Sequence, residues 1–183
     1  MKVYGMIYPQ QTYSEGYYDT DVLMYSVRHI NHIRVTVDRE KPKIEVMDGE
    51  NVIKRFTPET YLHHIEKGPV KPTDFEKTMF SFINYLSRED ILLFPDITCL
   101  GRSSPEIHRV YHEAWNKGIY LEFNRTSTLN TNSYIQTGYG NMGNVLQLID
   151  IQIDNCINDL KNMSVDFGCG RNIQNLSAQS KKN

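Results

Sequence analysis

Short apolar runs and two-residue alternations predict the strands of this chain. An apolar and aromatic run over residues 2–8 stops at Pro9 and predicts a buried first strand. Apolar and polar residues alternate over 33–38, which is the period of a half-buried strand. The continuous apolar run 91–94 is typical of a strand covered on both faces in a parallel sheet, and 119–123 predicts another strand.

Helical spacing separates these strands. Residues 20–30, 73–86 and 104–117 each repeat apolar side chains every three or four positions, which predicts three helices. The dipeptide Asp48-Gly49 lies between two apolar segments and predicts a β-hairpin, whereas the threonine- and asparagine-rich stretch 125–139 is expected to form a loop. Strands alternating with helices predict an α/β domain whose mainly parallel central sheet carries the hairpin as an insertion.

The most regular helical pattern comes near the end of the chain. Its apolar seam consists of Met142, Leu146, Ile149, Ile153, Cys156, Leu160 and Met163. This spacing predicts a helix packed lengthwise on a partner helix. A second apolar surface, formed by Val145, Leu148 and Ile151, indicates that the helix contacts its own core and something else. The remaining residues, 164–183, are expected to form a flexible polar tail.

Composition and charge narrow the class of protein. A chain of 183 residues corresponds to one domain. Its 20 basic and 22 acidic residues give a net charge of −2, which argues against a strongly basic wrapper of nucleic acid. No run approaches the roughly 18 apolar residues of a membrane span, so we expect a cytoplasmic protein without a membrane partner.

Cysteine and histidine spacing does not predict a metal site. Cys99, Cys156 and Cys169 are odd in number and lack the spacing of zinc ligands, so reduced thiols are expected. His29 and His32 could share an ion, but no acidic or cysteine partner stands at ligand spacing. We therefore expect neither a metal nor another cofactor.

The turn after the apolar run 91–94 is the most informative stretch for function. It holds Arg102 directly before a helix that begins near Ser104. A guanidinium beside the free N–H groups of a helix N-terminus suits an oxyanion such as phosphate. On spacing alone, an ion pair between Arg102 and a local carboxylate is the favoured interpretation.

Five stretches, in order along the chain, resemble a known family. They are MKVYGMI at 1–7, LGRS at 100–103, HRVYHEAWNKGIYLEF at 108–123, LNTNSY at 129–134 and the helix over 142–163. Over residues 1–9 and about 73–160, the chain resembles the catalytic domain of the serine recombinases, the resolvase and invertase family. The resemblance implies a resolvase-like three-layer α/β domain over 1–163, with 39–70 as a divergent insertion. It also implies that the apolar seam belongs to a long dimerisation helix.

The family's nucleophile motif is not preserved. In the family, a serine hydroxyl attacks a DNA phosphate while arginines neutralise the phosphate, and no metal is needed. The Arg-x-Ser motif that supplies this serine falls on Tyr8, Pro9 and Gln10, so both functional side chains are missing. The hydroxyl of Thr12 or Ser14, just past the expected position, could replace the serine.

The family's second motif is preserved in part. Its Asp-Arg-x-x-Arg-Ser sequence places Thr98 and Cys99 where the acid and the first arginine belong, whereas Arg102 and Ser103 are retained. Asp96 lies two residues before Thr98 and could replace the missing acid. The resemblance therefore implies a domain that has lost several phosphate-neutralising groups.

These departures favour a recombinase-like protein of DNA recombination or mobile elements that lacks strand-transfer activity. It would act as a dimerising regulatory module, as a homodimer or a heteromer with another recombinase subunit, and DNA is a further candidate partner. The first alternative is an active site-specific DNA recombinase that uses Thr12 or Ser14. The second is an α/β oligomer whose Arg102 corner binds a small phosphate ligand.

Overall fold

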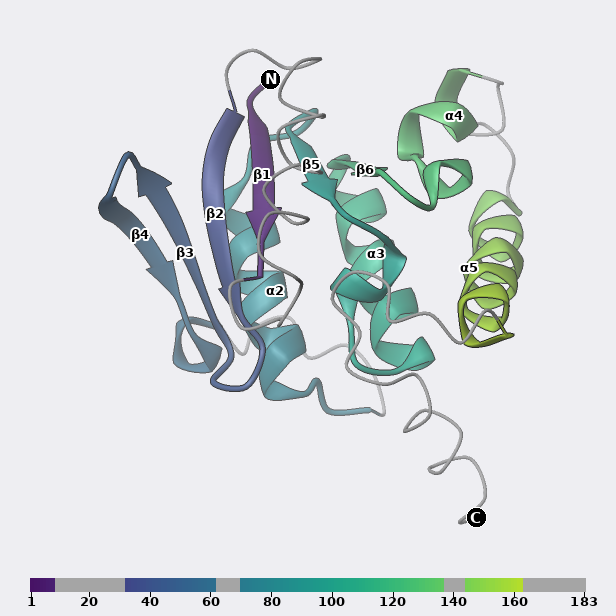
Figure 1. Cartoon of the computed structure of the whole chain (residues 1–183), viewed down its shortest axis with the longest axis horizontal. Helices are drawn as coiled ribbons and strands as arrows, with labels where there is room; N and C mark the ends of the chain where they lie inside the picture. Colours follow the sequence, from purple (N-terminus) through teal and green to yellow (C-terminus); the bar gives the residue numbers. More distant parts are fainter. Residues whose placement is uncertain (9–31, 62–69, 137–143, 163–183) are drawn as a thin grey trace.

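One mixed sheet organises the part of the chain that the structure describes. The computed structural model describes residues 1–8, 32–61, 70–136 and 144–162 (Figure 1). The strands are β1 (Val3–Ile7), β2 (His32–Asp38), β3 (Lys43–Asp48), β4 (Asn51–Phe56), β5 (Ile91–Phe94) and β6 (Tyr120–Phe123). The α-helices are α2 (Asp74–Tyr85), α3 (Ser104–Lys117), α4 (Thr131–Gln136) and α5 (Val145–Asn162). Short 3-10 turns are η1 (Pro58–Thr60), η3 (Ile97–Leu100) and η4 (Ser127–Leu129).

The strand order is β4-β3-β2-β1-β5-β6, and the pairings divide the sheet into two parts. The strands β2, β1, β5 and β6 are parallel, whereas β3 pairs antiparallel with both β2 and β4. The turn between β3 and β4 contains Asp48 and Gly49, and Gly49 has the positive φ of 59° that this turn favours. The prediction of an α/β fold with a mostly parallel sheet and an antiparallel hairpin is confirmed.

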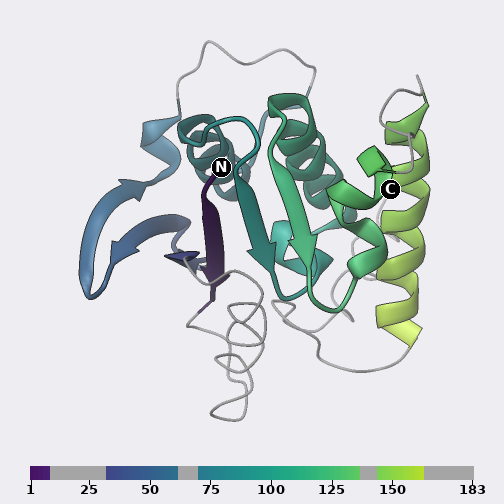
Figure 2. The same ribbon diagram turned by 90° about the horizontal axis from the view of Figure 1, so that it is seen from above.

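Helices α2 and α3 lie side by side on one face of the sheet (Figure 2). Thr73 caps α2, and its hydroxyl oxygen accepts the N–H of Glu76 while the Glu76 carboxylate accepts the N–H of Thr73, as the capping box predicts. Gly118 ends α3 in the left-handed conformation. The core between the sheet and these helices includes Phe82 and Tyr111, both fully buried.

Helix α5 lies beyond β6 and packs against α3 (Figures 1 and 2). Its residues Ile149 and Ile153 are 0% exposed and belong to the main core, and Leu146 and Cys156 are partly buried against that core. The face of the helix that we assigned to dimerisation therefore packs within the chain. Ile151 points away from this packing and is 57% exposed.

The segment that was expected to be a loop, 125–139, contains η4 and α4, so the prediction was wrong there. Polar side chains explain the difference. The N–H of Leu121 donates to Thr131 Oγ1 at 3.0 Å, and the N–H of Phe123 donates to Asn130 Oδ1 at 2.7 Å. These threonine and asparagine side chains bind the backbone of β6 instead of solvent, which fixes the segment along that strand.

Strand β4 forms the other end of the sheet. Its first five residues are exposed, among them Ile53, Lys54 and Arg55, and only Phe56 is buried. Arg55 pairs with Glu45 on β3 at 2.7 Å, and the register between β3 and β4 shifts at Val46. Strand β4 therefore adds only Phe56 to the main core, whereas β3 contributes Ile44 and Val46.

Several predictions lie outside the described residues. These are the helix over 20–30, the polar tail 164–183, the seam residues Met142 and Met163, and the side chain of Leu160. Within the described part of the chain, no helix has the length and apolar character needed to cross a membrane.

Candidate functional site

The candidate site lies at the carboxyl ends of the parallel strands. Strand β1 pairs with β2 on one side and with β5 on the other, and the chain enters β5 only after β2, β3 and β4, so the strand order reverses its direction at β1. In open α/β sheets, ligands bind beside the carboxyl ends of the strands at such a point. Here Tyr8 follows β1, Arg39 follows β2, Asp96 follows β5 and Arg125 follows β6.

Asp96 is the buried acid of this edge. It is 0% exposed and caps η3, and its Oδ1 accepts the N–H of Thr98 at 2.8 Å and the hydroxyl of Thr98 at 2.5 Å. Among the described residues, the buried Oδ2 has no hydrogen-bond partner. Burial raises the pKa of Asp96 to about 6, although the Thr98 hydrogen bonds and the charges of Arg125 and Arg39 oppose the shift. The charges of two arginines, Arg125 and Arg39, thus act on the residue suggested as the replacement acid.

Arg39 is a site residue that sequence reasoning missed. One of its terminal nitrogens, Nη2, donates to the carbonyl oxygen of Gly101 at 2.5 Å, and its guanidinium carbon lies 5.4 Å from the centre of the Phe75 ring. Burial lowers the pKa of Arg39, and repulsion from Arg102 lowers it further. The available signal was its position directly after a predicted strand, but 39–70 was assigned to a divergent insertion.

Arg102 is exposed and directs a free charge to solvent. Its backbone N–H donates to Glu106 Oε2 at 2.6 Å, so the nearby carboxylate binds the backbone. Among the described residues, the Arg102 guanidinium has neither an ion pair nor a hydrogen bond. The favoured interpretation, an ion pair with a local carboxylate, was therefore wrong, and an anion at this corner would bind the guanidinium rather than the N–H that Glu106 occupies.

Ser103 is the N-cap of α3. Its Oγ accepts the N–H of Glu106 at 3.4 Å, so the hydroxyl that we considered catalytic has a structural partner. Tyr8, at the family's nucleophile motif, is 2% exposed and its hydroxyl donates to the carbonyl of Cys99 at 2.9 Å. Burial raises the pKa of Tyr8 far above its ordinary value, so this hydroxyl stays protonated. Gln10, Thr12 and Ser14 lie outside the described residues.

Two of the three cysteines lie in the described part of the chain. Cys99 is fully buried in η3, and Cys156 is a partly buried free thiol, as expected for that residue. Cys169 lies outside the described residues.

Gly101 holds the turn tightly against α3. A Cβ at this position would lie 2.7 Å from Glu106 Cβ and 2.8 Å from the backbone nitrogen of Ile107. The close approach puts the Gly101 carbonyl within reach of Arg39 and presents the N–H of Arg102 to Glu106. Glycine is required here because of space.

Replacing Gly101 by alanine is expected to lower the free energy of unfolding by about 1–3 kcal/mol, because the new Cβ forces the turn away from α3. Urea denaturation measures this loss. The control is Gly49→Asn, because a side chain at Gly49 meets open space and asparagine tolerates its positive φ. Equal losses in the two variants would contradict the steric explanation.

The edge as a whole suits a phosphate group. Arg39 and Arg102 interact electrostatically with each other, and Arg39 and Arg125 both act on Asp96. Guanidinium groups bind phosphate oxygens through paired charge-assisted hydrogen bonds. A scan against models of protein families and a search of curated proteins both find no match to the chain.

Proposed function

We propose that the chain is a serine-recombinase-like module of DNA recombination that binds DNA phosphate at this edge and does not transfer strands. The observation that carries the proposal is the exposed guanidinium of Arg102 beside the partly buried Arg39, at the carboxyl ends of β2, β1 and β5. The central order β2-β1-β5-β6 supports it, because the stretches that resemble the family fall on β1, on the turn before α3, and on α3 and β6. The resolvase-like three-layer arrangement is part of the proposal.

The electrostatics of the edge favour an anionic ligand. The Gly101 carbonyl and the Phe75 ring both contact the Arg39 guanidinium and favour its position near Arg102. Two like charges in a partly buried site repel each other, and a bound phosphate would convert that repulsion into attraction. Asp96 opposes an anion, but its buried carboxylate is itself set among the positive charges.

The hydroxyl groups of the described edge do not support strand transfer. Ser103 accepts a backbone N–H, the Thr98 hydroxyl donates to Asp96, and the Tyr8 hydroxyl is buried on a carbonyl. A nucleophile needs a base or a lowered pKa, and it must also reach the phosphate. Burial raises the pKa of Tyr8, and the Thr98 hydroxyl, although it meets the Asp96 carboxylate, belongs to a residue that is only 5% exposed and is therefore closed to a DNA phosphate. The module is therefore proposed to assist recombination by binding, as a homodimer or beside an active recombinase subunit.

The variant Arg102→Ala is expected to bind a DNA duplex about tenfold more weakly or worse. The reason is that it loses one charge-assisted hydrogen bond to phosphate, which contributes roughly that factor to affinity. Fluorescence anisotropy of a labelled duplex at several salt concentrations measures this, and the salt slope should fall by about one. The matched control is Arg88→Ala, because Arg88 is also exposed but precedes β5, at the amino ends of the parallel strands.

Three outcomes would overturn this function. Equal losses for Arg102→Ala and Arg88→Ala would show that binding follows net charge alone. Stabilisation by inorganic phosphate without duplex binding would favour a small phosphate ligand. A covalent protein–DNA adduct that disappears in Thr12→Ala or Ser14→Ala would favour the active recombinase.

A further inference from the structure

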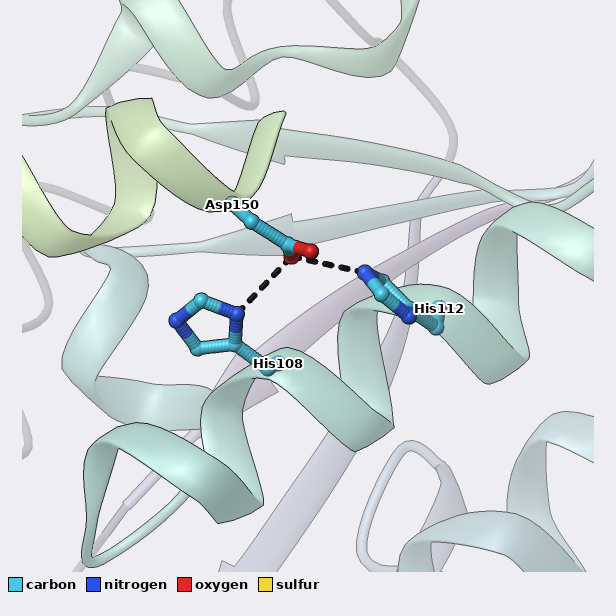
Figure 3. Close-up of side chains that lie close together, drawn as sticks. All are labelled: His108, His112 and Asp150. Atoms are coloured by element: carbon cyan, nitrogen blue, oxygen red, sulfur yellow. Dashed lines mark hydrogen bonds and ion pairs between the residues drawn. The ribbon is translucent and has the colours of Figure 1, made fainter. Parts of the chain in front are cut away.

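Helices α3 and α5 face each other through histidine and aspartate side chains (Figure 3). His108 and His112 lie one turn apart on α3 and both point toward Asp150 on α5. His108 Nδ1 is 2.8 Å and His112 Nε2 is 2.7 Å from the same oxygen, Asp150 Oδ1. One ligand atom from each of the three residues lies within 4.8 Å of the others, the spacing needed to hold one ion.

A second layer of hydrogen bonds orients the cluster. The other ring nitrogen of His108, Nε2, lies 3.0 Å from Asp154 Oδ1, and the Ser104 hydroxyl donates to the same oxygen at 2.9 Å. Histidine ligands of metals usually donate their second N–H to a carboxylate, which fixes the tautomer and the direction of the lone pair. With Nε2–H donating to Asp154, the His108 Nδ1 lone pair faces Asp150 and His112.

We propose that His108, His112 and Asp150 bind a divalent transition metal of the zinc class, with Asp154 as the positioning residue for His108. Two imidazoles with one carboxylate suit zinc and its neighbours, whereas magnesium and calcium prefer oxygen ligands alone. The three side chains are 20–32% exposed, so an ion can enter from solvent and a water molecule can complete the coordination.

The site departs from the expectation that no metal is bound. Its residues are separate from Arg39, Asp96 and Arg102, which form the candidate phosphate site. The proposed metal site therefore goes beyond the proposed phosphate binding. Bound metal would replace the protons that the two imidazoles share with Asp150 and would join α5 to α3 through coordinate bonds. The role that follows is a clamp that fixes α5 on the domain.

Metal binding can be measured directly on the whole chain at pH 7. Calorimetric titration with Zn²⁺ should give one site per chain, and Co²⁺ should produce visible absorption bands that Zn²⁺ removes. Zn²⁺ at a hundredfold excess over its dissociation constant should raise the melting temperature by about 5–10 °C. Both the bands and the shift should disappear in His112→Gln and Asp150→Asn, and circular dichroism shows whether these variants fold.

Two matched controls decide between this cluster and other ligands. Asp159→Asn changes an exposed aspartate on the same helix, and His32→Ala removes a histidine on β2 that the sequence paired with His29. Both variants should bind Zn²⁺ as the parent does. Absence of a Co²⁺ band in the parent, unchanged binding in folded His112→Gln, or loss of binding in His32→Ala would each overturn the proposal. Because the readout is metal binding, failure of the phosphate proposal would leave this result unaffected.

Discussion

Replacing Ile153 by aspartate is expected to lower the free energy of unfolding by about 4 kcal/mol, because the variant places a carboxylate where the side chain is 0% exposed. The free energy of unfolding of a native domain is only about 5–15 kcal/mol in total. Ile153 also belongs to the main core with Ile149, so the lost packing adds to the cost of burying a charge. Urea denaturation followed by circular dichroism should show a large fall in the midpoint.

The matched control is Ile151→Asp, the same substitution on the same helix. Ile151 is 57% exposed, so this variant should keep the unfolding midpoint of the parent. Sedimentation of both variants separates stability from association. A folded Ile153→Asp protein with half the parent's mass would show that the inward seam is a dimer interface, whereas a halved mass in Ile151→Asp would place the interface on the outer face of α5.

Asp96→Asn is expected to stabilise the chain at pH 8 by up to about 3 kcal/mol and to give no such gain at pH 4. The pKa of Asp96 is raised from 3.8 to about 6 in the folded chain by burial. Below the unfolded pKa, both states are protonated and the group makes no difference to stability. Above the unfolded pKa, Asp96 ionises more readily in the unfolded chain than in the folded one. The parent therefore loses stability as the pH rises through about 6, whereas the neutral side chain of the variant does not titrate.

Measuring the free energy of unfolding of the parent and of Asp96→Asn between pH 4 and pH 8 tests whether the variant becomes the more stable protein as the pH rises. The exposed Asp159→Asn supplies the baseline for replacing an aspartate on the surface. An Asp96→Asn variant that is less stable than its parent at pH 8 would mean that Arg39 and Arg125 favour the charged form more than burial opposes it.

Local patterns predicted most of the elements. The predicted Asp48-Gly49 turn is present in the structure, and so are two other short signals that the sequence carries, the capping box of Thr73 with Glu76 and the helix terminator Gly118. The apolar run 91–94 likewise forms β5. These features depend on neighbours in the chain, which a sequence displays directly.

Features that depend on distant neighbours were not predictable in the same way. The seam through Ile149 and Ile153 has helical spacing whether it faces a partner or its own core, and only packing on α3 decides between them. His108 and His112 offered a visible signal, since they lie four positions apart on a predicted helix. Their acidic partner, Asp150, comes from another helix 38 positions beyond His112, a distance that spacing within one motif does not reveal.

The two ends of the sheet differ in how they meet other molecules. Along β6, backbone N–H groups are bound by Asn130 and Thr131, which leaves less of that strand to pair with a foreign chain. Along β4, Lys54 and Arg55 stand exposed on the outermost strand, and the register shift at Val46 twists the hairpin. Charges and bulges on outer strands discourage edge-to-edge aggregation. Both ends of the sheet thus carry features that oppose pairing with a foreign strand, side-chain hydrogen bonds to the backbone at β6 and exposed charges with a register shift at β4.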